Sequence, residues 1–111
     1  MSVQKITAAE LAKKLAANEE VHLVDVRAEE KYNNERIEHD KINSKNIVKT
    51  EIFAMAEDET KTIDLPINQT HIISCTTGNS ARKSAEILAE KGYDVLVLDG
   101  GLTAWKEFQN K

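Results

Sequence analysis

Short apolar runs of strand length alternate with helical patterns along this chain, and this alternation constrains the fold more than any other feature. Alternation of this kind is typical of βαβ units, in which helices connect parallel strands. The run 95–98 is apolar without interruption, which favours a strand that is covered on both faces. The sequence therefore predicts an α/β fold: a three-layer sandwich with a small, mostly parallel sheet and helices on both faces.

Periodicity and cap residues predict the individual elements. Thr7 and Glu10 have the spacing of a capping box at the start of a helix. Gly92 stands just past a helical pattern, where a left-handed cap favours glycine. The segment from Glu35 to Lys49 is polar and irregular, with only a weak strand signal. We expect helices at 7–17, 28–34, 51–59, 80–91 and 102–108, and strands at 21–26, 46–48, 71–75 and 93–98.

Length and charge restrict the class of protein. The 111 residues match the size of one domain, so we expect a single domain over 1–111. The 15 basic and 19 acidic side chains give a net charge of −4, which argues against general nucleic-acid binding. No leader pattern is visible at the N-terminus, and no segment approaches the roughly 20 apolar residues that span a bilayer. We expect a cytoplasmic monomer that has neither a nucleic acid nor a membrane as partner.

The single cysteine, Cys75, is the most informative residue. One cysteine excludes an internal disulfide, and no Cys/His cluster has the spacing of zinc ligands, so we expect no metal. Cys75 ends a predicted strand, and a loop containing Gly78 leads from it into a predicted helix. Backbone N–H groups of residues 76–81 and the helix dipole would favour a thiolate there. The alternative is that Cys75 is a small buried apolar residue at the end of a core strand.

The histidines offer no obvious base for this cysteine. His71 lies four residues upstream on the same predicted strand, about 13 Å away along an extended chain. His22, within another strand, and His39, in the irregular segment, would reach Cys75 only if the fold brought them there. We expect neither to be catalytic.

Three motifs in order resemble the rhodanese family of sulfurtransferases. They are Leu23-Val-Asp25-Val-Arg27, the loop Cys75-Thr-Thr-Gly78-Asn79, and the closing Gly100-Gly101-Leu-Thr-Ala-Trp105. The resemblance implies a rhodanese-like domain whose cysteine takes a sulfane sulfur from thiosulfate, a polysulfide or a protein persulfide. The cysteine holds the sulfur as a persulfide and passes it to a thiol or protein acceptor, without a cofactor.

The resemblance also implies roles for individual residues. Cys75 is the nucleophile, Asp25 and Arg27 support the site structurally, and Trp105 with the Gly100-Gly101 turn contributes packing. The loop that binds substrate and persulfide comprises Thr76, Thr77, Gly78, Asn79, Ser80 and Ala81.

The loop departs from the family pattern C-x-x-G-x-R-S. Ser80 occupies the position of the arginine, Ala81 that of the serine, and Thr76 a position where thiosulfate-using members often carry a cation. Arg82, in the first turn of the following helix, is a candidate for anion support, although an arginine at this place is more often part of a solvated helix surface. Because a dianion binds less well without a bidentate guanidinium, we expect weak thiosulfate activity or a neutral or protein-bound donor.

Two other functions stay open. A phosphatase or arsenate reductase with a C-x5-R loop would need an arginine where Ala81 stands, and Arg82 is one residue too late. A non-catalytic binding module would not need the cysteine, so the presence of Cys75 favours sulfur chemistry.

Overall fold

The computed structural model describes residues 3–110, which contain one five-stranded sheet. The strand order is β1-β5-β4-β2-β3, and all four strand pairings are parallel. The structure thus confirms the α/β fold predicted from the alternating pattern. The strands are β1 (Gln4–Ile6), β2 (Val21–Asp25), β3 (Ile42–Asn46), β4 (Thr70–Ser74) and β5 (Asp94–Leu98).

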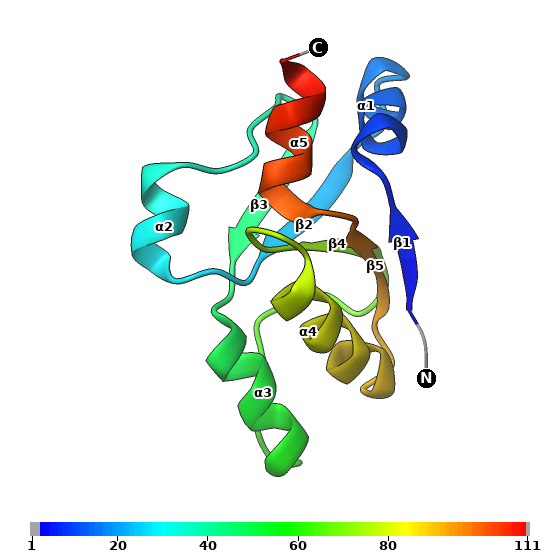
Figure 1. Ribbon diagram of the computed structural model, residues 1–111. Coiled ribbons are helices and arrows are strands. Elements are labelled where there is room, and N and C mark those ends of the chain that lie inside the picture. Colours follow the sequence, from blue (N-terminus) through cyan, green and yellow to red (C-terminus); the bar gives the residue numbers. More distant parts are fainter. Residues whose placement is uncertain (1–2, 111) are drawn as a thin grey trace.

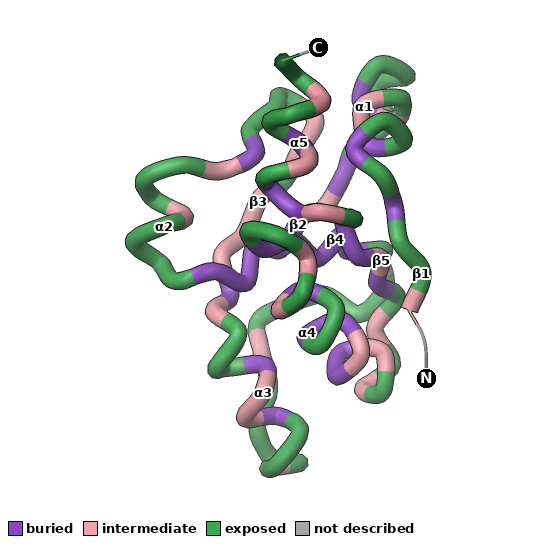
Figure 2. The backbone as a smooth tube through the Cα atoms, viewed as in Figure 1, coloured by how far each residue is buried: buried purple, intermediate pink, exposed green. Residues whose placement is uncertain are grey.

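Helices cover both faces of the sheet and give the molecule three layers (Figure 1). In the described residues these are α1 (Ala8–Ala16), α2 (Glu29–Asn34), α3 (Lys49–Glu57), α4 (Asn79–Glu90) and α5 (Gly101–Gln109). One face carries α1 and α5, and the other carries α3 and α4. Buried backbone is concentrated in the central strands between these layers (Figure 2).

Two apolar clusters, one on each face, hold the layers together. On the α3–α4 face, Ile52 and Leu88 meet Ile73 of the central strand β4. On the α1–α5 face, Leu11 and Trp105 belong to the second cluster. Trp105 is only 5% exposed, which confirms that the last helix packs into the core. Within residues 3–110, no helix has both the length and the apolar character needed to cross a membrane.

The predicted cap residues form the expected local structures. The Thr7 amide donates to Glu10 Oε1 (2.9 Å), and the Glu10 amide donates to Thr7 Oγ1 (3.1 Å), which completes the capping box. The hydrogen bond from the Thr7 backbone holds the pKa of Glu10 below its ordinary value. Gly92 adopts a left-handed conformation with φ of +94° just after α4.

One strand prediction was wrong and one strand was not predicted. The weak strand signal at 46–48 lies at the end of β3, which runs from Ile42 to Asn46 beside β2. Its polar sequence has no apolar pattern, so its strand conformation follows from backbone pairing at the sheet edge. The strand β1 was not predicted, because three residues at an edge carry too short a pattern.

Candidate active site

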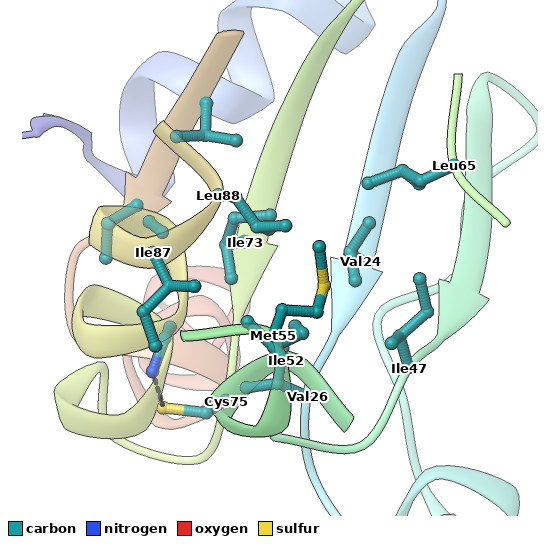
Figure 3. Close-up of a cluster of buried hydrophobic side chains, with 14 residues drawn as sticks. Val24, Val26, Ile47, Ile52, Met55, Leu65, Ile73, Cys75, Ile87 and Leu88 are labelled. Carbon is teal, nitrogen blue, oxygen red and sulfur yellow. Dashed lines mark hydrogen bonds between the residues drawn. The ribbon is translucent and has the colours of Figure 1, made fainter. Parts of the chain in front are cut away.

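Cys75 directly follows β4, the central strand of the parallel sheet, and four residues later α4 begins. Ligands of parallel sheets bind beyond these carboxyl ends of the strands. The Cys75 Sγ accepts hydrogen bonds from the amides of Gly78 (2.9 Å) and Ala81 (3.4 Å). Cys75 is 5% exposed and lies at one end of the α3–α4 apolar cluster (Figure 3). The sulfur therefore lies against apolar side chains on one side and accepts hydrogen bonds from two backbone amides.

Gly78 gives the cysteine loop its turn. Its φ of +106° lies in the left-handed region, and it caps α4 without a side-chain hydrogen bond. The first amides of a helix lack partners inside the helix. In residues 3–110 the hydrogen bonds to Sγ come from Gly78, at this cap, and from Ala81, in the first turn of α4.

The start of α5 forms backbone hydrogen bonds with the same loop. The Leu102 amide donates to the Cys75 carbonyl (2.9 Å), and the Thr103 amide donates to the Thr76 carbonyl (3.1 Å). Gly101 has a φ of +58°, and a Cβ there would overlap the Cys75 carbonyl oxygen and lie 2.8 Å from that of Thr76. The Gly100-Gly101 turn therefore does more than pack: it brings a helix terminus against the backbone of the cysteine loop.

Asp25 and Arg27 form a buried ion pair after β2. Arg27 Nη2 lies 2.7 Å from Asp25 Oδ2, Arg27 Nε lies 3.0 Å from both carboxylate oxygens, and Nη2 also donates to the Glu35 carbonyl. The Asn46 side-chain amide donates to the carbonyls of Asp25 and Arg27, each at 2.9 Å. These contacts hold the segment after β2 in place beside the cysteine loop.

A hollow of about 240 Å³ opens over Cys75. Thr76, Thr77 and Ser80 of the cysteine loop line it, as does Arg27, but so do two lysines that the sequence did not single out. The full lining is Val26, Arg27, Ala28, Lys31, Lys49, Cys75, Thr76, Thr77 and Ser80.

Lys31 and Lys49 follow the carboxyl ends of β2 and β3, the same edge of the sheet at which Cys75 follows β4. The rule that ligands bind at the carboxyl ends of parallel strands could therefore have pointed to both residues. Its use requires the order of the strands in the sheet, which the sequence did not provide.

Arg82 and Asn79 lie elsewhere. Both line a smaller hollow of about 70 Å³ together with Lys5 and Asp99. The structure therefore does not bring Arg82 into the hollow over Cys75, although the two residues are only seven positions apart.

The histidines do not line the hollow over Cys75. The His71 Nε2 lies 2.7 Å from the Pro66 carbonyl oxygen and forms a hydrogen bond with it. The His22 ring packs edge-to-face with the His71 ring, and the two ring centres are 6.1 Å apart. His39 Nδ1 accepts a hydrogen bond from the Lys41 amide at 3.0 Å.

Comparisons with known proteins agree with this geometry. The family model of the rhodanese-like domain matches residues 7–108. The Bacillus subtilis (strain 168) protein named "Putative sulfurtransferase YtwF" is 24% identical over 106 residues, which cover 96% of this chain and 93% of that protein.

Two solved structures extend the comparison. The structure of a rhodanese-like domain protein from Staphylococcus aureus is 29% identical, with a TM-score of 0.73, over 93% of this chain and 91% of that one. The human single-domain sulfurtransferase TSTD1 shares the fold at 19% identity and a TM-score of 0.72, over 95% and 96% of the two chains. Since the family model spans nearly the whole chain and the cysteine loop stands at the expected edge of the sheet, the protein belongs to the rhodanese-like domain family.

Proposed function

We propose that this protein is a sulfurtransferase that carries a sulfane sulfur on Cys75 as a persulfide. The observation that carries the proposal is the Cys75 Sγ at the base of an open hollow, with the amides of Gly78 and Ala81 donating to it. Two amide donors and the first turn of α4 stabilise negative charge on sulfur. Membership of the rhodanese-like family and the name of the Bacillus subtilis relative support the same chemistry.

The first step transfers sulfur to the protein. The Cys75 thiolate attacks the sulfane sulfur of a donor such as thiosulfate, a polysulfide or a protein persulfide. A new S–S bond forms, the donor's own S–S bond breaks, and the leaving group departs with the electron pair. The negative charge then rests on the outer sulfur of the Cys75 persulfide, within the reach of the loop amides of residues 76–81.

The second step passes the sulfur on. A nucleophilic acceptor, such as a thiolate or cyanide, attacks the outer sulfur, and Cys75 leaves as a thiolate. The donors from Gly78 and Ala81 favour this departure because they stabilise the same thiolate that began the cycle. Neither step requires a metal or an organic cofactor, since each breaks one S–S bond and forms one S–S bond, or a C–S bond when cyanide is the acceptor, and moves no electrons to a third group.

The arrangement favours sulfur transfer over phosphate chemistry. A C-x5-R oxyanion loop needs a guanidinium facing the cysteine, and here Ala81 holds that position while Arg82 lines a separate hollow. The guanidinium that does line the hollow over Cys75, that of Arg27, is paired with the Asp25 carboxylate and is not free to clamp a phosphoryl group.

Intact-mass spectrometry without reductant tests the proposal. The purified protein is incubated with polysulfide or thiosulfate, and a gain of one sulfur atom is expected. Cyanide should remove that sulfur as thiocyanate, in a ratio of about one per chain. The matched control is Cys75→Ser, which keeps the size of the side chain and its hydrogen bonding but cannot form a persulfide.

The outcomes separate the competing functions. A sulfur atom gained by the wild type and absent from Cys75→Ser supports the transferase. Failure of every donor to load a protein that is correctly folded and reduced contradicts it and favours a non-catalytic binding module.

A further inference from the structure

Two lysines from outside the cysteine loop lie at the hollow over Cys75. Lys31 belongs to α2, Lys49 is the first residue of α3, and both line the hollow with Cys75. Both side chains are exposed, and in residues 3–110 neither ammonium takes part in an ion pair. Their charges are therefore available to a ligand that enters the hollow.

The charge at this hollow differs in sign from that of the whole molecule. The third basic lining residue, Arg27, is neutralised by Asp25, and no Asp or Glu lines the hollow. Lys31 and Lys49 thus supply two unit positive charges in a chain whose net charge is −4. Ser80, where the family pattern places arginine, supplies no charge from the loop.

Backbone hydrogen bonds fix Lys49 relative to the cysteine. The Lys49 amide donates to the Val26 carbonyl (3.0 Å), and the Val26 amide donates to the carbonyl of Ser74 (2.9 Å), the residue before Cys75. The Lys31 amide donates to Ala28, another residue of the hollow, at 3.1 Å. The stems of the two lysines therefore start from ordered backbone on two sides of the hollow.

We propose that Lys31 and Lys49 bind the negatively charged end of the sulfur donor and thereby make the site prefer donors of high negative charge. This inference rests on the proposed sulfurtransferase function and replaces the missing loop arginine with lysines from α2 and α3. With thiosulfate, the Cys75 thiolate attacks the outer sulfur, the S–S bond breaks, and sulfite leaves with the electron pair. The lysines hold the sulfonate oxygens, so they stabilise the two negative charges that the sulfite carries away.

Donors of different charge test this assignment. We compare kcat/KM for thiosulfate, a dianion, with that for methanethiosulfonate, a monoanion that leaves as methanesulfinate. Lys31→Gln and Lys49→Gln are each expected to lower the value for thiosulfate about tenfold, and that for the monoanion about threefold. The matched control is Lys83→Gln, because the Lys83 ammonium lies 4.7 Å from the centre of the Phe53 ring and outside the hollow. It should change both values by less than about twofold.

Binding to an inactive protein separates this inference from the proposed function. In Cys75→Ser, sulfate is titrated while the NMR shifts of the 76–81 amides are followed. The dissociation constant should rise about tenfold when Lys31 or Lys49 is also replaced by Gln. This readout involves no sulfur transfer, so it can succeed or fail independently of persulfide formation.

A rescue variant completes the test. Ser80→Arg restores a loop guanidinium, and it should recover most of the thiosulfate activity that the Lys31→Gln/Lys49→Gln double variant has lost. The assignment is overturned if the lysine variants affect both donors equally, or if they affect sulfate binding no more than Lys83→Gln does. It is also overturned if Ser80→Arg alone raises thiosulfate activity tenfold while the lysine variants leave that activity unchanged.

Discussion

Replacement of Gly101 by alanine would disturb the cysteine loop at a contact that lies outside the hollow. Gly101 begins α5 with a φ of +58°, and the next two amides of that helix donate to the carbonyls of Cys75 and Thr76. A Cβ at Gly101 would overlap the Cys75 carbonyl oxygen. The backbone must therefore move at the contact that holds the loop.

The cost has two parts that can be separated. A left-handed conformation costs a residue with a Cβ about 1–2 kcal/mol. The overlap with two backbone carbonyls adds about 1–3 kcal/mol, the usual cost of overpacking, because backbone atoms yield less than a flexible side chain. Gly101→Ala should thus lower the free energy of unfolding by roughly 2–5 kcal/mol.

Gly92→Ala is the matched control. Gly92 also has a positive φ, of +94°, but a Cβ there would meet only the end of the Ile67 side chain, at 3.5 Å. It should lose only the conformational part, about 1–2 kcal/mol. Urea unfolding followed by circular dichroism gives both values, provided that the dependence on urea is unchanged. Equal destabilisation by the two variants would refute the argument that the carbonyls of Cys75 and Thr76 leave no room at Gly101.

Two further predictions concern the ion pair and the capping box. Arg27→Met should lower the free energy of unfolding by about 3–5 kcal/mol, because it leaves the Asp25 carboxylate buried without its partner. The double variant Asp25→Asn/Arg27→Met should lose less than the sum of the two single variants in urea unfolding, and strict additivity would contradict the pairing. The pKa of Glu10 lies below its ordinary 4.5 because the Thr7 backbone donates to it, so the stabilisation is present above 4.5 and is lost as pH falls through the lower folded value. The destabilisation caused by Glu10→Ala should therefore shrink in acid. Glu10→Gln, which keeps an acceptor, should be the milder change at neutral pH. A difference in the free energy of unfolding between the wild type and Glu10→Ala that stays constant into acid would contradict this.

Local signals predicted much of the fold. The Thr7–Glu10 capping box and the glycine after α4 formed as expected, because their contacts lie within a few residues of one another. The polar strand β3 was misplaced because its conformation depends on pairing with β2, a segment more than fifteen residues away. The strand β1 was missed because its three residues carry too short a pattern, and its conformation depends on pairing with β5 near the other end of the chain.

The candidate site divides in the same way. The cysteine, its glycine turn and the helix that follows are contiguous, so the sequence alone predicted a loop whose amides face the sulfur, and the structure shows the amides of Gly78 and Ala81 donating to it. The sequence also determined that the loop has no cation of its own. Only the tertiary structure decided which charges compensate for this: the parallel order of β3, β2 and β4 brings Lys31 and Lys49 to the hollow and leaves Arg82 at another. The physical reason is that a side chain's neighbours across a sheet depend on strand order and register, which long-range backbone hydrogen bonds and core packing fix.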